Sequence, residues 1–433
     1  MKETGDSRLP IGSSDPVSFK CTCSSNANPS NGLVLLFYRY FSAPPSLQSP
    51  GTNSISELAA FHTRLTSELH LGGKIRVGEE GFNITVGGTK NEIQSYIKHC
   101  VSHWSFDGLN LDTSEMQNAF FKPTSGGCAC VFGGSPASVR VTTEITPMGI
   151  TNYIPQNWNI IDSLEPATFH ERCWKDEQKI LVDVRNHYES RIGYFVDPVS
   201  GDKAITPEIR RFSQWPQYVK SHKEEFEGGA SKPGQGRQIM AYCTGGIRCE
   251  KGVRWMADEL EKREGNKICT LKGGIAAYLT WMDEEIKQGR KRPEESLFRG
   301  KNYVFDARGS TALTEIEDDP EPVSNCHVCK TASDRLSKCR SKGCHLILVV
   351  CSLCEETKDP RCCQGCLDLE ARDKDNQTDA DNRRRPICLC EMEREARLWG
   401  DTVRPQRTQG WKKEKRPTGG TNIRIRTLKD KST

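Results

Sequence analysis

The chain has 433 residues, 20 cysteines and a formal net charge of +4. Its length fits two or three domains, and a charge so close to balance excludes a protein that binds polyanions over its whole surface. No apolar run is long enough to cross a bilayer, and no charged start with an apolar stretch behind it opens the chain, so neither a membrane partner nor secretion is expected.

Residues 1–31 are polar and Ser-rich and are expected to be disordered, whereas the segment 32–150 alternates strand-like and helix-like patterns. The predicted order is strand, helix, two strands around a Gly turn, helix and strand, which is typical of a ferredoxin-like α+β domain. The strands are expected at 33–41, 74–86, 120–122 and 139–145, the helices at 55–69 and 91–101, and a Gly- and Ser-rich loop at 124–137.

A second domain is predicted over residues 158–308. Short apolar runs alternate there with helical patterns, which predicts a parallel sheet with helices on both faces. The strands are expected at 180–184, 239–242 and 267–271, and the helices at 250–264 and 274–287.

The strand at 239–242 leads directly into a short loop, which consists of Cys243, Thr244, Gly245, Gly246, Ile247 and Arg248. A parallel strand presents such a loop at the carboxyl edge of its sheet, where ligands bind in these folds. The two glycines let the backbone curl so that its N–H groups face the sulfur, and the following helix and Arg248 add positive potential. We therefore expect Cys243 to be held as a thiolate, which is the nucleophilic form of cysteine.

Four residues separate Cys243 from Arg248, one fewer than a cysteine phosphatase needs to enclose a phosphate. The smaller loop favours a sulfur-bearing or similarly compact group over phosphoryl transfer.

Two alternatives stay open. Cys243 can be a buried cysteine at a strand end, and Cys249 can be either a resolving thiol or a packed residue of the first helical turn.

The acidic, Pro-containing segment 309–325 is a predicted linker, and nine cysteines follow it between Cys326 and Cys366. Crowded Cys-x-x-Cys pairs in a long chain are typical of metal ligation in a reducing compartment rather than of disulfides. Since each such turn offers two thiolates to a tetrahedral Zn²⁺, the module 326–367 predicts two structural zinc ions. The predicted ligands are Cys326, Cys329, Cys339, Cys344, Cys351, Cys354, Cys363 and Cys366.

Several features of the C-terminal part stay open. Either Cys362 or Cys363 is spare, His345 can replace one ligand, and the spacing does not fix the pairing. A metal-free module and an iron–sulfur cluster are the alternatives to zinc. The tail 368–433 is predicted to be mostly disordered, because it holds 15 Lys or Arg against 6 Asp or Glu from residue 383 onward. Its two cysteines, Cys388 and Cys390, receive no role.

Several segments resemble rhodanese-domain proteins, and in particular the bacterial tRNA uridine(34) hydroxylases, in which a ferredoxin-like domain precedes the rhodanese domain. CTGGIRCEK (243–251) resembles the rhodanese active loop, and DVRNHYE (183–189) resembles the second characteristic strand. The implied fold class is α/β: a rhodanese-like parallel sheet flanked by helices, preceded by a ferredoxin-like α+β domain and followed by a small zinc-binding module. Further matches to the hydroxylases are EEGFNITVGG (79–88), AITPEIRRF (204–212), LKGGIAAYL (271–279) and GKNYVFDAR (300–308).

The resemblance implies oxygen-dependent 5-hydroxylation of the wobble uridine of tRNA, with Cys243 as the essential residue and with Asp183 and Arg185 bracing its loop. A structural ion pair is the alternative for Asp183 and Arg185. Sulfur transfer through a persulfide on Cys243, supplied by an external sulfur donor, needs the same thiolate and is not separated from hydroxylation. A non-catalytic adaptor that binds RNA or protein is the third hypothesis.

No motif for a dedicated redox cofactor is visible in the sequence. The expected location is the cytoplasm, or a plastid if the source is a plant. The chain departs from the family at Phe82, which replaces an isoleucine, and in an insertion at 124–137 that carries Cys128 and Cys130. Its charged tail is also longer.

The partner implied is tRNA. Aromatic side chains on an open sheet can stack on bases, and basic side chains near them can bind phosphates. The alternative is that the aromatics are core and the charges are a solvated face. The candidates are Tyr38, Tyr40 and Phe82 for bases and Arg39, Lys74 and Arg76 for phosphates.

Overall fold

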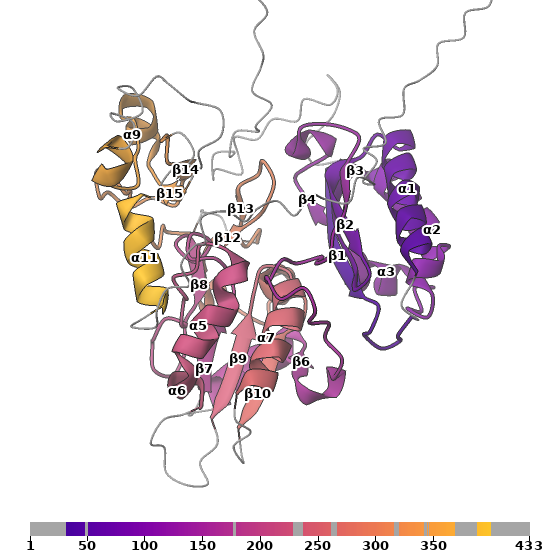
Figure 1. The fold of residues 1–433 in the computed structure, drawn as a ribbon, viewed down its shortest axis with the longest axis horizontal. Coiled ribbons are helices and arrows are strands. Elements are labelled where there is room, and N and C mark those ends of the chain that lie inside the picture. Colours follow the sequence, from indigo (N-terminus) through magenta and orange to yellow (C-terminus); the bar gives the residue numbers. More distant parts are fainter. Residues whose placement is uncertain are drawn as a thin grey trace, which may run out of the picture.

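The computed structural model describes residues 32–47, 51–175, 179–227, 237–260, 266–315, 320–341, 344, 346–368 and 388–399. An α+β domain lies beside a parallel α/β domain, and a small cysteine-rich module is attached to the second (Figure 1). Within the described ranges, no helix is both long and apolar enough to cross a membrane. The segment 1–31 and most of the tail, for which disorder is expected, lie outside the described residues.

The N-terminal domain has the predicted order of elements. Its bounds are β1 (Gly32–Tyr40), α1 (Thr52–Glu68), β2 (Gly72–Gly78), β3 (Gly81–Thr89), α2 (Lys90–Val101), η2 (Trp104–Phe106), α3 (Ser114–Phe121), β4 (Thr124–Ser125), η3 (Ala129–Phe132) and β5 (Ser138–Val141). The sheet order is β4-β1-β3-β2-β5, and β1 and β2 both pair antiparallel with β3. Helices α1 and α2 cover one face of this sheet, over a core that includes Leu35, Phe37 and Ile84 (Figure 1).

Two expected details of this domain are wrong. The predicted strand at 120–122 is the end of α3, where Phe121 packs in the core. The strand that follows is β4, inside the segment 124–137 that was expected to be a loop and that also holds η3. A pair of aromatic residues fits a buried strand and a buried helix end equally well, so periodicity over so short a stretch does not separate them.

The central domain is built on a parallel sheet of order β6-β10-β9-β7. Its bounds are η4 (Trp158–Ile160), β6 (Asp162–Leu164), α4 (Pro166–Lys175), β7 (Lys179–Asp183), β8 (Gly193–Phe195), η5 (Phe212–Gln214), α5 (Trp215–Ser221), α6 (Lys223–Glu227), β9 (Gln238–Tyr242), α7 (Ile247–Glu259), β10 (Lys267–Leu271), α8 (Gly274–Lys287), η6 (Pro293–Glu295), β11 (Phe298–Gly300), β12 (Asn302–Tyr303) and β13 (Ser310–Thr311). All five residues of β9 are buried, as expected for a central strand with helices on both faces. The expected α/β class, a parallel sheet flanked by helices and preceded by a ferredoxin-like α+β domain, is thereby confirmed.

The C-terminal module is held by a two-stranded hairpin. Its bounds are β14 (Leu336–Lys338), β15 (Ile347–Val349), α9 (Ser352–Thr357) and, from the tail, α11 (Leu389–Trp399). Helix α11 packs beside α5, and Leu398 belongs to the core of the central domain (Figure 1). A part of the charged tail is therefore a helix docked on the parallel α/β domain.

Candidate functional site

The loop that follows β9 surrounds a buried sulfur. Cys243 is fully buried, and the Gly246 N–H donates to its Sγ at 3.1 Å. Gly246 has a φ of +99°, a conformation that favours glycine, and it is the residue from which α7 starts. The predicted loop geometry, with a backbone N–H turned inward at a strand-to-helix junction, is present.

A second Gly-rich turn supports the loop from outside. The N–H groups of Ile275 and Ala276, in the first turn of α8, donate to the carbonyls of Cys243 and Thr244 at 2.9 and 3.0 Å. A Cβ on Gly274 would lie 2.3 Å from the Cys243 carbonyl oxygen, so only glycine fits there. The loop carbonyls are thereby bound outside, and this helps to turn the N–H groups toward the sulfur.

The pKa of the Cys243 thiol is set by opposing effects. Burial raises this pKa, but the Cys249 thiol, the charge of Arg248 and the backbone N–H groups of Cys249 and Gly246 lower it to about 6. Each of these groups donates a hydrogen bond or positive potential to the anion. The loop is therefore built for a thiolate at neutral pH, and Cys249 is a hydrogen-bond donor to it.

Arg248 has a partner that sequence analysis did not single out. Its guanidinium donates to both carboxylate oxygens of Glu189, at 2.6 and 2.8 Å, and Thr244 Oγ1 donates to the same carboxylate at 3.0 Å. Burial would favour the protonated acid, but Arg248 holds the pKa of Glu189 below its usual range. Glu189 is the last residue of the DVRNHYE segment. It could have been predicted from the rule that a buried arginine needs a counter-charge.

Asp183 and Arg185 form a second buried pair, at the end of β7. Arg185 Nη2 donates to Asp183 Oδ2 at 2.7 Å and to the Gly193 carbonyl at 2.6 Å. The guanidinium also lies over the ring of Tyr242, 5.9 Å from its centroid, and Tyr242 is the residue before Cys243. The pair thus contacts the strand that carries the thiol, next to the loop.

The second face of the N-terminal sheet covers the Cys243 loop. Alternate residues of β1 point toward it, in register with successive loop residues. A Cβ on Gly245 would lie 2.8 Å from Leu36, and one on Gly246 would lie 2.5 Å from the Tyr38 hydroxyl. Tyr40 donates to the Ile247 carbonyl at 3.4 Å. The site is therefore composite: the central domain supplies the thiol, and β1 supplies its lid.

Two lysines complete this interface. Lys122, at the end of α3, lies over the Tyr38 ring, 5.0 Å from its centroid, and burial lowers its pKa to about 8 although Glu250 and Cys243 act in the opposite sense. Lys251 of α7 is fully buried between Glu80 and Glu144, at 2.8 and 3.0 Å. The contacts of Lys251 join the two domains within one turn of the Cys243 loop.

The expected RNA contacts are only partly compatible with this arrangement. Phe82 is in the hydrophobic core, Tyr40 is buried against the loop, and Arg39 is buried with hydrogen bonds to three backbone carbonyls. For these three the structural alternative is the one observed. Tyr38 stays half-buried beside the loop, and the alternating side chains Lys74 and Arg76 of β2 are exposed.

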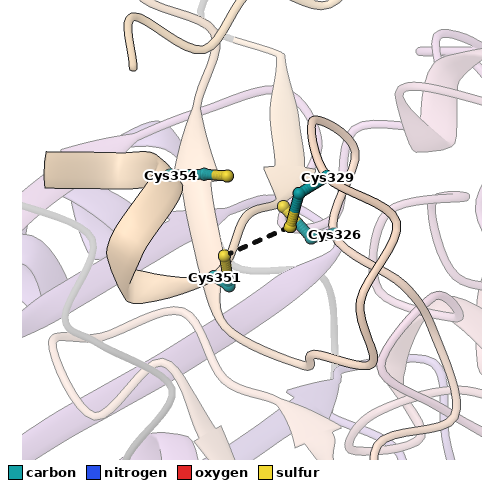
Figure 2. Close-up of side chains that lie close together, drawn as sticks. All are labelled: Cys326, Cys329, Cys351 and Cys354. Atoms are coloured by element: carbon teal, nitrogen blue, oxygen red, sulfur yellow. Dashed lines mark hydrogen bonds between the residues drawn. The ribbon is translucent and has the colours of Figure 1, made fainter. Parts of the chain in front are cut away.

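The cysteines of the C-terminal module form groups that can hold metal ions. Cys326, Cys329, Cys351 and Cys354 place their sulfurs within 4.8 Å of one another. Figure 2 shows the four side chains directed toward a common centre, two from the turn before β14 and two from the start of α9. A tetrahedral four-cysteine site needs this convergence of two knuckles.

A second group joins Cys339, Cys344, Cys362 and Cys366, again within 4.8 Å. The structure thus places Cys362 in the set for which the sequence favoured Cys363. Cys363 lies instead in a third group with Cys362, Cys388 and Cys390. His345, the possible substitute ligand, lies outside the described residues.

Two segments match known protein families. Residues 32–125 match the family described as UPF0176 acylphosphatase like domain, and residues 299–367 match the family described as Rhodanase C-terminal. The first segment is the N-terminal domain up to β4. The second begins in β11 and ends just after Cys366, so Cys388 and Cys390 lie beyond it.

Curated relatives cover most of the chain. A tRNA uridine(34) hydroxylase of Staphylococcus epidermidis is 30% identical over 338 residues, which cover 78% of this chain and 89% of the relative. A protein of the same name from Bacillus cytotoxicus is 30% identical over 331 residues, covering 76% and 86%. Rhodanese-like domain-containing protein 6 of Arabidopsis thaliana is 28% identical over 376 residues, but the match covers only 58% of that longer relative.

Proposed function

The chain belongs to the family of tRNA uridine(34) hydroxylases, and on this premise we propose that it modifies a uridine of tRNA with the Cys243 thiolate. The observation that carries the proposal is the loop itself: a buried sulfur that accepts the Gly246 N–H at 3.1 Å and has a pKa of about 6. A structural cysteine has no need of such a cradle, since burial among apolar groups keeps a thiol protonated.

The proposed reaction is 5-hydroxylation, in which Cys243 acts as a nucleophile. Its sulfur bonds to C6 of the uracil ring, and the C5–C6 π electrons move onto C5 and the C4 oxygen. C5 then bonds to dioxygen. Two thiol groups of an external reductant supply two electrons and two protons and become a disulfide, so that the O–O bond is cleaved and water is released. The C5 proton leaves, the S–C6 bond breaks, and 5-hydroxyuridine and the thiolate are recovered.

The surface next to the loop supports tRNA as the partner. Lys74, Arg76 and Arg140 are exposed at the β2–β5 edge, where Arg76 and Arg140 are register partners. Lys74 donates to the carbonyl of Phe305 at 2.9 Å, and the exposed Phe305 ring lies 5.7 Å from the Arg248 guanidinium. Cations for phosphates and a ring for a base thus lie within reach of one nucleotide chain.

An unpaired wobble base needs no duplex opening, but Cys243 is fully buried under β1. We propose that β1 and the catalytic loop separate to admit the base, and that Tyr38 and Lys122 then contact it from the lid side.

Sulfur transfer is the second candidate, and the same cradle favours it. The inward Gly246 N–H that stabilises the thiolate would equally bind the outer sulfur of a persulfide on Cys243. Both reactions need Cys243 as the nucleophile, so replacing it would abolish either one. The two candidates are therefore distinguished by the nucleoside product that is formed.

A Cys243→Ala variant is expected to abolish 5-hydroxyuridine. The wild type and the variant are expressed in cells that lack their own homologue, and tRNA nucleosides are quantified by mass spectrometry. The matched control is Cys173→Ala, which removes another fully buried thiol of the same domain and should leave the product level unchanged. A change confined to thiolated nucleosides would support sulfur transfer, and full hydroxylation by Cys243→Ala would contradict thiolate catalysis.

We propose in addition that the first two cysteine groups hold structural zinc. Four thiolates at tetrahedral spacing saturate Zn²⁺ and leave no position for a substrate, so the role is to fold the module rather than to catalyse.

A further inference from the structure

Two cysteines of the tail, Cys388 and Cys390, meet the cysteine-rich module through space. Cys390 and Cys388 lie 3.4 and 3.7 Å from Cys362, sulfur to sulfur, and 3.4 Å from one another. Residues 369–387, between the module and this pair, lie outside the described part of the chain. The meeting of the two segments is therefore not a consequence of local sequence.

The sulfur separations have the size that a shared metal requires. Four sulfurs at about 2.3 Å from a tetrahedral Zn²⁺ are about 3.8 Å from one another. Around Cys362, the distances to Cys344, Cys363 and Cys366 are 3.7, 3.9 and 3.3 Å. A disulfide would need about 2.05 Å. The spacing is that of ligands around ions and not of covalent pairs.

Cys362 belongs to two groups at once. It completes a set of four with Cys339, Cys344 and Cys366, and another set of four with Cys363, Cys388 and Cys390. Each set lacks a fourth ligand without it, and a thiolate sulfur has lone pairs for two metal ions. We propose that these seven cysteines hold a binuclear Zn²⁺ centre in which the Cys362 sulfur bridges the two ions. With the separate site at Cys326, the chain would then bind three zinc ions rather than two.

The charge around the centre is suited to this assignment. Seven thiolates and two Zn²⁺ carry three net negative charges, which burial would make unfavourable without cations nearby. Arg210 donates to the Cys344 carbonyl and pairs with Glu391 at 3.2 Å. The charges of Cys344 and Cys388 act on Arg210, and that of Cys390 acts on Arg191. Arg210 therefore contacts the cysteine group from the central domain, and Arg191 adds positive charge within electrostatic range of it.

The centre also explains how a short polar helix is fixed on the central domain. Besides the Leu398 side chain in the core and the Arg210–Glu391 pair, helix α11 contacts this domain through an exposed Arg397–Glu208 pair at 2.7 Å. The Leu398 carbonyl also accepts from Ser221 Oγ at 2.9 Å. Exposed ion pairs contribute little, whereas two thiolate–zinc bonds at the start of the helix would hold it firmly. The second ion thus fastens α11 beside α5.

The test uses the full chain with cadmium-113 in place of zinc. Two ¹¹³Cd nuclei that share one sulfur show a mutual scalar coupling, and separate ions do not. The wild type should bind three ions per chain by native mass spectrometry and give three ¹¹³Cd signals, of which two are coupled. Two ions, or three uncoupled signals, would overturn the proposal.

Paired variants locate the bridge. Cys388→Ser/Cys390→Ser should leave two ions and no coupling. Its matched control, Cys326→Ser/Cys329→Ser, should also leave two ions but keep the coupled pair of signals. Loss of the coupling in the control, or its survival in Cys388→Ser/Cys390→Ser, would overturn the assignment. None of these measurements depends on enzymatic activity, so their outcome is independent of the proposed function.

Discussion

A Glu189→Gln substitution is expected to lower the free energy of unfolding by roughly 3–5 kcal/mol, because it leaves the Arg248 guanidinium buried without a counter-charge. The two side chains are 0% and 8% exposed, and their closest oxygen and nitrogen are 2.6 Å apart. Glutamine keeps the shape and one acceptor, but its amide N–H group would face the N–H donors of Arg248. Of the charged groups that act on Arg248, the Cys243 sulfur would then remain.

Urea unfolding followed by tryptophan fluorescence measures this loss, with Trp215 and Trp255 buried in the same domain. The control is Glu171→Gln, which removes an exposed carboxylate that pairs with Lys175 at 3.3 Å, and its effect should stay below about 1 kcal/mol.

The pKa of Glu189 is depressed in the fold. Its contribution is therefore present above the ordinary carboxyl pKa and is lost as the pH falls below it, so wild type and variant should converge in acid. An effect no larger than that of the control would contradict the account.

Lys251→Met is expected to have a comparable effect, roughly 3–5 kcal/mol, at the junction of the two domains. The lysine ammonium lies between two carboxylates whose side chains are 2% and 7% exposed. These carboxylates also accept backbone N–H groups: Ile145 donates to Glu80 at 2.6 Å, and Met148 donates to Glu144 at 3.1 Å. Without the cation, two buried anions face one another, and the segment after β5 loses its connection to α7.

The same unfolding experiment tests this expectation, with Lys175→Met as the matched exposed control. A double variant, Lys251→Met/Glu80→Gln, should be more stable than Lys251→Met alone, because it removes one of the two unpaired anions. Burial raises the pKa of Glu80 even in the wild type, so acid should reduce the cost of Lys251→Met by protonating this group. If the double variant is less stable than Lys251→Met, charge is not what holds Lys251, Glu80 and Glu144 together.

Local patterns in the sequence predicted three of the four strands of the central parallel sheet, and the helices α7 and α8. The strand at 267–271 and the helix at 274–287 have the predicted bounds, and α7 begins three residues before its predicted start. Each of these elements is defined by its own apolar period and by a Gly at its border. The Cys243 loop could be predicted for the same reason, since its residues follow one another along the chain.

Sequence analysis also missed short local elements, such as β6 and α4, and it took the end of α3 for a strand. The parts of the site that it missed are contacts between distant segments. Glu189 lies 59 positions from Arg248, and only the need to neutralise a buried charge connects them. The lid formed by Leu36, Tyr38 and Tyr40 depends on which face of β1 points outward, which a strand with apolar residues on both faces does not reveal. Cys388 and Cys390 looked isolated because their partners, Cys362 and Cys363, are 25 or more positions earlier in the chain.

The central claim is that Cys243 is an anion at neutral pH, and its rate of alkylation as a function of pH tests this most directly. The protein is treated briefly with iodoacetamide from pH 4.5 to 9.5, and the peptide that contains Cys243 is quantified by mass spectrometry, which separates it from the other thiols. With a pKa of about 6, the rate should reach half its maximum near pH 6 and be nearly constant from pH 7 upward. A rate that rises only above about pH 8.5, as for an ordinary thiol, would contradict the account.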